Sequence, residues 1–199
     1  MRRVAKLATA AAKTPVTLAE VKVHCRVTFS DDDTILGIYL ASAVATAEQF
    51  LQRKLITQSW KMFLDYWPGQ IKTFFGDLQS VTHVKYTDID GTTATMSNTL
   101  YDVDTNSVPG RIVLKHGQSW PSATLNAVNP IEVQFDTGYG AETTNVPEDI
   151  RNALLILAAH FYENREMYLV SDNRSFSVTE IPFSVKALLS PYRVWEWIL

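Results

Sequence analysis

The chain has 199 residues, of which 46% are hydrophobic and 20% charged, a balance typical of a folded protein with an apolar core. This length fits one domain, or a small domain with an insertion, and excludes a large multidomain enzyme. The formal charge of −3 excludes a general basic field for nucleic acid, and the single cysteine, Cys25, excludes an intramolecular disulfide and favours a reducing compartment.

The first 14 residues form a basic segment, with Arg2, Arg3, Lys6 and Lys13 among alanines and no acid before Glu20. A targeting peptide is one interpretation, but the segment lacks the long apolar run of a secretory signal and the Ser and Arg content of a transit peptide. We expect residues 1–14 to be a flexible or docking arm.

Two helices are predicted next. Thr17 and Glu20 have the spacing of a capping box, which predicts a short helix ending near Phe29. The acidic run at residues 30–33 is expected to cap a second helix that reaches about Arg53. Its apolar residues recur at steps of three and four, the pattern of an amphipathic helix.

Residues 55–139 change to β-branched and aromatic residues that alternate with polar ones. Seven strands are predicted, at residues 56–66, 71–75, 81–87, 92–97, 101–104, 111–114 and 131–135. The turn at Asp90-Gly91 predicts a hairpin between the strands on either side of it.

A third helix should begin at Pro147, followed by two acids and an apolar stripe, and end before a polar run at residues 171–175 that is expected to be a loop. Pro182 begins a final short helix, which Pro191 kinks or ends before the aromatic tail at residues 192–199. The predicted class is therefore α+β: a helical bundle with a large antiparallel β insertion at about residues 55–140, within one domain at residues 15–191.

Metal chemistry finds little support. Around Asp88 and Gly91, a calcium loop would place Tyr86 at its first ligand position and Ser97 at its last, so that interpretation fails. His160, Glu163 and Glu166 share a helix face, yet a di-metal bundle needs such sets from several helices. We predict no metal and no cofactor.

Catalytic motifs are equally weak. Residues 117–121 lack the second glycine of a nucleophile elbow, and His24 and Cys25 are neighbours that point apart on a helix. Residues 138–140 lack the remaining residues of a phosphate-binding loop. Asp102 and Asp104 would share a strand face and are the best acid pair for a hydrolase, but such spacing is common. No active site is predicted.

Five tryptophans suggest contact surfaces, because Trp, Tyr and Arg anchor many interfaces. Trp60 and Trp120 are expected to pack in the core, since they lie in or near strands. The tail at residues 192–199 is too apolar to stay free, so it should dock either on another protein or on its own core.

Several short segments together resemble the head-tail connector proteins of long-tailed phages, also called adaptor or head-completion proteins. They follow one another in family order from Pro15 to Arg193: residues 15–22, the acid-capped second helix, 55–60, 78–81 with Tyr86 and Asp90-Gly91, 117–121, 138–140, 146–147, 160–166 and 187–193. Residues 1–14 do not match what is expected of the family.

The resemblance implies a helical core with a β insertion and no catalysis. It also implies a ring of about twelve copies under the portal protein, joined below to a stopper or tail-terminator protein. Genomic DNA would pass through the channel without sequence-specific binding, and no membrane is involved. The expected location is the virion neck, with assembly in the host cytoplasm.

Two surfaces are expected to serve this role. We expect the tail residues Tyr192, Arg193, Trp195, Trp197 and Leu199 to dock on the portal. A ring needs contacts between different faces of one chain, and we expect Glu163, Arg165 and Glu166 to contribute to one of them.

Three alternatives remain open at this point. The chain could be another tail-completion component or the connector of a gene-transfer particle, or it could be a DNA-packaging protein that binds DNA through its basic arm. A more distant alternative is an accessory cell-wall hydrolase.

Overall fold

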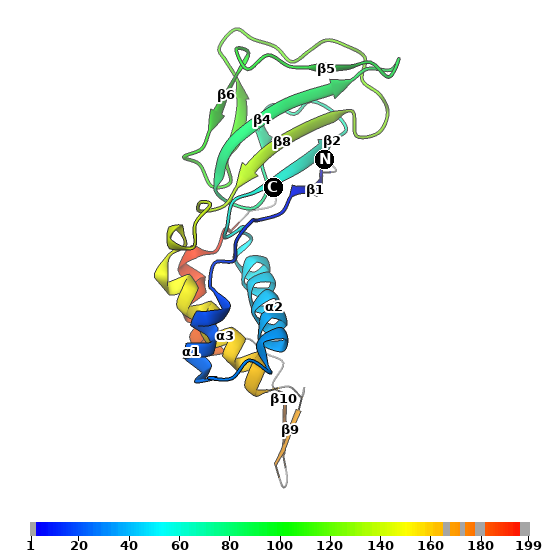
Figure 1. Cartoon of the computed structure of the whole chain (residues 1–199). Coiled ribbons are helices and arrows are strands. Elements are labelled where there is room, and N and C mark those ends of the chain that lie inside the picture. Colours follow the sequence, from blue (N-terminus) through cyan, green and yellow to red (C-terminus); the bar gives the residue numbers. More distant parts are fainter. Residues whose placement is uncertain (1–2, 165–167, 172–173, 178–181, 196–199) are drawn as a thin grey trace. The chain divides into compact units, whose positions relative to one another are not determined.

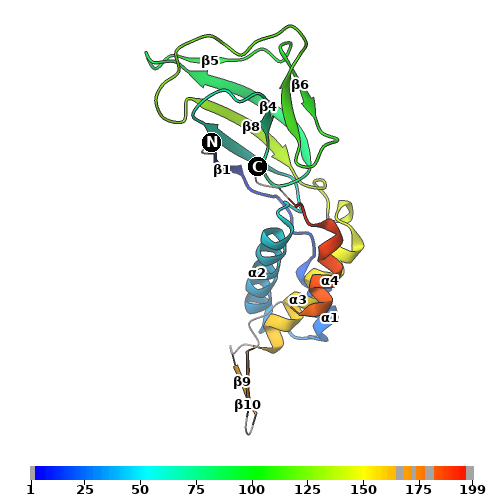
Figure 2. The same cartoon turned by 180° about the vertical axis from the view of Figure 1, so that it is seen from behind.

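The computed structural model describes residues 3–164, 168–171, 174–177 and 182–195 (Figure 1 and Figure 2). Its chain divides into two compact units. The β unit takes its described residues from 3–13, 53–141 and 194–195, and the helical unit takes its described residues from the segments 14–52 and 142–193. The described residues contain four α-helices and antiparallel sheets, with most of the strands consecutive between α2 and α3, which confirms the predicted α+β class.

The β unit contains two antiparallel sheets. The larger has the order β1-β2-β8-β4-β5, with strands at Arg3–Thr9, Gln58–Leu64, Ile131–Thr137, Leu78–Thr87 and Thr93–Thr95. The smaller has the order β3-β7-β6, with strands at Ile71–Lys72, Arg111–Leu114 and Tyr101–Asp104. All seven strands predicted from the alternating pattern are therefore present.

The predicted hairpin at Asp90-Gly91 is confirmed by the pairing of β4 with β5, in which Thr87 faces Thr93. The Asp88 carboxylate accepts hydrogen bonds from the backbone N–H of Asp90 at 3.0 Å and of Thr92 at 2.9 Å. Asp88 therefore uses its side chain to close the turn, which is a common reason for aspartate at such positions.

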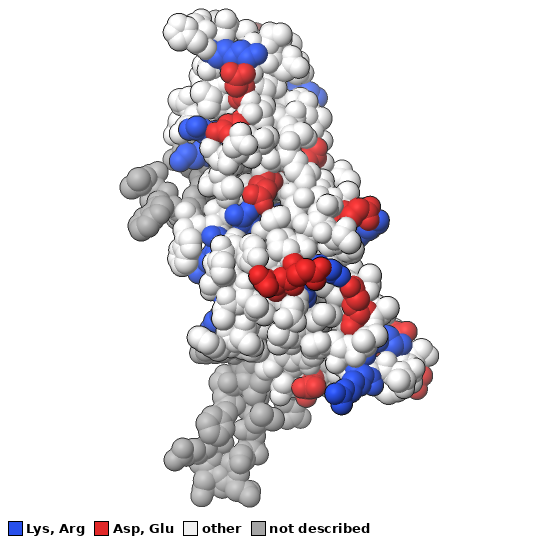
Figure 3. All heavy atoms as spheres, turned by 90° about the vertical axis from the view of Figure 1, so that its left-hand side faces the viewer, with Lys and Arg blue, Asp and Glu red and all other residues white. Residues whose placement is uncertain are grey.

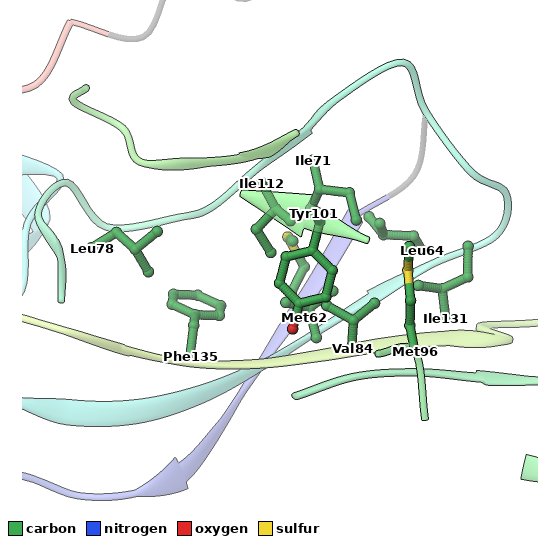
Figure 4. Packing of buried hydrophobic residues seen from close by; sticks show 11 residues of the cluster. Met62, Leu64, Ile71, Leu78, Val84, Met96, Tyr101, Ile112, Ile131 and Phe135 are labelled. Atoms are coloured by element: carbon green, nitrogen blue, oxygen red, sulfur yellow. The ribbon is translucent and has the colours of Figure 1, made fainter. Parts of the chain in front are cut away.

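The apolar core of the β unit lies between side chains of the two sheets, as Figure 4 shows. Strand β8 alternates buried and half-buried residues, so that Val133 and Phe135 point into this core. Tyr101 and Ile112 contribute to it from the smaller sheet. Trp60 and Trp120 pack against the core partly buried, as predicted.

Strand β1 was not predicted. It belongs to the segment expected to be an arm, yet it pairs antiparallel with β2, where Val4 faces Phe63 and Lys6 faces Lys61. Two alanines, one lysine and one arginine among its seven residues weaken the β propensity of this segment, so the pairing with β2, 50 or more residues away, decides its conformation.

The helical unit contains α1 (Leu18–Cys25), α2 (Asp33–Leu51), α3 (Glu148–Glu163) and α4 (Phe183–Leu189), with short 3-10 turns at Thr143–Asn145 and Ser190–Tyr192. The predicted capping box is present, because the Glu20 carboxylate accepts from the Thr17 backbone N–H at 2.7 Å and the Thr17 hydroxyl accepts from the Glu20 N–H at 3.2 Å. Helix α3 begins directly after Pro147, as predicted.

Helix α1 ends at Cys25, four residues earlier than predicted. Arg26 adopts a left-handed conformation with φ of 57°, and its backbone N–H bonds to carbonyls of the last turn. Such a helix end is usually marked by glycine, and here no glycine is present to indicate it.

The acidic run before α2 does not cap the helix through its side chains, contrary to the prediction. Asp32 holds the N-cap position without a side-chain capping bond. Its carboxylate instead accepts a hydrogen bond from the Tyr162 hydroxyl on α3, and Asp33 pairs with Lys22 on α1 at 2.5 Å. These carboxylates therefore connect α2 to both neighbouring helices.

Within the described residues, α2 is the one helix long and apolar enough to cross a membrane by length and composition. The core helix of a soluble protein passes the same test. Five residues of α2 form a buried stripe at helical spacing: Leu36, Leu40, Ala43, Ala47 and Leu51. Helix α2 packs against α3, whose own buried residues share the same periodicity, so α2 fits the role of a core helix.

The polar run expected to be a loop at residues 171–175 falls partly in two strands. Strands β9 (Tyr168–Ser171) and β10 (Arg174–Ser177) pair antiparallel, with Arg174 facing Ser171. Residues 171–175 are all polar in the sequence, so the local pattern alone did not indicate two paired strands.

Candidate interaction surfaces

Side chains considered for catalysis have structural partners instead. Asp104 accepts hydrogen bonds from Ser107 at 2.6 Å and from Arg111 at 2.8 Å, and these bonds hold the pKa of its carboxyl well below the usual range. Its neighbour Asp102 lies 3.7 Å from Lys115. Both acids therefore have a basic partner, and the lowered pKa of Asp104 is the opposite of what a general acid needs.

The side chains considered as metal ligands are not grouped around a common site. Among the residues that the structure describes, no group of three or more His, Cys, Asp and Glu is placed to hold a metal ion. The His160 ring contacts the amide of Asn164 at 3.2 Å, at the C-terminal end of α3. Cys25 is half-buried, and burial, with the charge of Glu163, raises the pKa of its thiol and lowers its reactivity.

The predicted portal-docking residues divide into three groups. Tyr192 donates from its hydroxyl to Asp149 at 3.0 Å, and the Arg193 guanidinium lies 5.0 Å from the centre of the Phe50 ring. These two residues thus attach the chain end to its own helical unit. Trp195 is 67% exposed, whereas Trp197 and Leu199 lie outside the described residues.

The predicted subunit-interface residues are described only in part. Glu163 is exposed and is the last residue of α3. Arg165 and Glu166 lie outside the described residues. The structure therefore gives no geometry for this cluster beyond the position of Glu163.

An apolar groove that was not predicted lies in the helical unit, with a volume of about 380 Å³. Its walls come from α1 and α3: Ala19, Glu20, Val23, His24 and Leu155. Val23 is 79% exposed. The sequence did contain a signal for it, because Val21 and Val23 are two apart on a helix and cannot both face the core. Val21 is buried, which leaves Val23 at the surface.

The acid in the groove is already engaged. The Glu20 carboxylate bonds to the backbone N–H and hydroxyl of Thr17 and to Arg151 at 2.5 Å, and these partners lower its pKa. Its charge is thus balanced within the helical unit, and the groove presents mainly apolar atoms.

A second uncharged surface is the outer face of α2, where Ile38, Ala41, Ser42 and Ala45 are exposed. Ile38 is 54% exposed. The Ser42 hydroxyl donates to the Ile38 carbonyl at 2.9 Å, and the Thr46 hydroxyl donates to the Ser42 carbonyl at 2.8 Å. Because the helix itself satisfies these hydroxyls, the face can be covered by apolar groups at little cost.

Charge is distributed unevenly between the two units. The segments of the helical unit carry twelve acidic and seven basic residues, whereas those of the β unit carry nine acidic and eleven basic residues. In Figure 3, one face shows basic and acidic side chains interspersed among uncharged ones. This face offers no continuous basic surface of the kind that binds nucleic acid.

The sequence matches the family model described as phage gp6-like head-tail connector protein at residues 15–106 and 121–193. The chain belongs to this family. The match includes segments of both units, which confirms the resemblance found from the short sequence segments. The connector's role is therefore structural, joining parts of a phage-like particle.

Solved structures with the same fold come from gene transfer agent (GTA) particles. A chain in the neck of an empty GTA particle, computed with C6 symmetry, has a TM-score of 0.78 and 23% identity. A chain in the neck of the native particle, computed with C12 symmetry, has a TM-score of 0.75 and 24% identity. A chain in the native GTA virion has a TM-score of 0.76 and 23% identity. Each comparison covers 98% of this chain and 97% of the other. No curated protein matches the sequence at a significant level.

Proposed function

We propose that this connector is the repeating subunit of a ring in the neck of a phage or gene-transfer particle. The observation that carries the proposal is the family match at residues 15–106 and 121–193. The shared fold supports it, since it extends over 98% of the chain and occurs in necks computed with C6 and C12 symmetry. The C12 symmetry favours twelve copies.

A connector must bind different partners at its two ends. We assign these partners as the portal protein on the head side and a stopper or tail-terminator protein on the tail side. DNA passes through the ring without being bound, and the formal charge of −3 is compatible with that passage. The ring belongs to the virion neck and assembles in the host cytoplasm.

The exposed Trp195 is the described residue best suited to contact the portal. An exposed tryptophan near a chain end offers a large apolar surface that a partner pocket can bury. Trp197 and Leu199 extend the same tail, and Tyr192 and Arg193 hold its base on the helical unit. Glu163, with Arg165 and Glu166, is assigned to the contact between subunits, so Arg165→Glu should weaken the ring. Unchanged ring assembly by this variant would contradict the assignment.

Light scattering after size-exclusion chromatography tests the proposal, with the chain alone and mixed with the portal of the same particle. The portal complex should gain the mass of twelve chains. Failure to associate with portal or tail ring at any salt concentration would refute it. Trp195→Ala should weaken portal binding, whereas Tyr66→Ala, which removes another exposed aromatic residue of the β unit, should bind normally.

A further inference from the structure

We propose that the groove between α1 and α3 of one subunit receives the outer face of α2 from the neighbouring subunit. The proposal rests on the ring function above and adds two apolar surfaces to the contact between subunits. Both surfaces belong to the helical unit.

The groove has the chemistry of a helix-binding site. Val23 projects from α1 with 79% exposure, and Ala19 and Leu155 complete an apolar wall. The one acid in it, Glu20, is held by Thr17 and Arg151, so a partner that covers the groove does not isolate this carboxylate. The exposed His24 is the other ionisable side chain that the partner meets there.

The outer face of α2 has the matching chemistry. The exposed residues lie at positions i, i+3, i+4 and i+7 of the helix: Ile38, Ala41, Ser42 and Ala45. Helices that bind in grooves place their contact residues at this spacing. Ile38 supplies one large apolar anchor, and the small residues after it allow close approach of a second helix. This stretch has eight residues, as does α1, so both surfaces extend over about 12 Å at 1.5 Å per residue.

The occupant is a second copy of this chain because the symmetry requires it. If two grooves met each other, the contact would be isologous and would close as a dimer. Rings with C6 or C12 symmetry, as in the necks that share this fold, need two different surfaces that bind head to tail. The groove and the α2 face are two such surfaces, because the groove is lined by residues of α1 and α3 whereas the exposed face from Ile38 to Ala45 belongs to α2.

Cysteine cross-linking tests the contact directly in the assembled ring. In a Cys25→Ser background, one preparation carries Val23→Cys and another carries Ile38→Cys. Mild oxidation of the mixed ring should give a disulfide-linked dimer, and neither variant alone should. A cross-linked dimer from Val23→Cys alone would indicate groove-to-groove contact and overturn the proposal, as would the absence of a cross-link in the mixture.

Charge substitutions provide the second readout. Val23→Glu and Ile38→Glu should each raise the concentration needed for ring assembly at least about tenfold, because each would bury an unpaired carboxylate. Val128→Glu is the matched control, since Val128 is 72% exposed but belongs to the β unit, and it should assemble normally. Circular dichroism confirms that all three variants are folded.

The outcomes separate the two proposals. If the wild-type chain forms no ring, alone or on the portal, the proposed function fails. If the wild type forms rings and both glutamate variants form them equally well, the ring function stands and this interface is wrong. If Val128→Glu weakens assembly as much as Val23→Glu does, the groove has no special role and the interface is equally wrong.

Discussion

Gly138 follows strand β8 in a backbone conformation that side chains rarely allow, with φ of 134°. A Cβ added there would lie 2.7 Å from the Ile56 carbonyl carbon and 2.8 Å from the Thr57 nitrogen. Both are backbone atoms and cannot rotate away. Gly138→Ala should therefore cost about 1–3 kcal/mol for the dihedral angle and a similar amount for the clash, together about 2–6 kcal/mol.

Urea unfolding followed by tryptophan fluorescence measures this loss, since the described tryptophans all belong to the β unit. Alanine variants of two other glycines separate the cost of the dihedral angle from the cost of the clash. Gly69→Ala has open space and an ordinary φ, so it should be nearly neutral, and Gly91→Ala has a φ of 82° with open space, so it should lose only about 1 kcal/mol. A Gly138→Ala variant no less stable than Gly91→Ala would refute the steric reasoning.

Three further perturbations test other parts of the structure. Burial alone would raise the pKa of Glu132, but bonds from His83 and Lys61 lower it on balance. The bonds to the charged Glu132 carboxylate stabilise the fold fully above the ordinary glutamate pKa of about 4.3, and this stabilisation is lost as the pH falls through the lowered pKa of the folded state. Glu132→Gln should therefore reduce the loss of β-unit stability in acid, measured as the free energy of unfolding against pH. An unchanged pH profile would contradict this. Cys25 should react with iodoacetamide at about pH 8 more slowly than a free thiol, and Glu163→Gln should speed the reaction; equal rates for wild type and variant would exclude a role for that charge. Tyr162→Phe leaves Asp32 without its hydroxyl partner and should destabilise the helical unit by about 1–2 kcal/mol, measured by circular dichroism; no change in its midpoint would show that the bond contributes nothing.

Local patterns predicted most of the fold because many elements carry their own signals. The capping box at Thr17 and Glu20 and the proline before Glu148 located two helix starts directly. Alternation between buried and half-buried residues located β8. In each case the sequence signal lies within a few residues along the chain.

What could not be predicted depends on distant partners. Strand β1 forms only because β2 supplies its hydrogen bonds. The Asp32 carboxylate bonds to the Tyr162 hydroxyl, 130 residues away in sequence, and makes no capping bond to α2. The contacts of the tail could not be predicted for the same reason, since Tyr192 bonds to Asp149 and Arg193 contacts Phe50 in segments far apart in sequence. The apolar groove required knowledge of which face of α1 is covered by the rest of the helical unit.

The insertion of the β segment between α2 and α3 affects how the chain folds during synthesis. Helix α2 ends at Leu51 and its packing partner α3 begins at Glu148, so a ribosome making about 5–20 residues per second needs roughly 5–20 s to supply that partner. During this interval the stripe from Leu36 to Leu51 has no α3 to cover it. The nascent chain therefore exposes the apolar stripe of a 19-residue helix while the β unit is still being synthesised, and it is a natural substrate for chaperones at that stage.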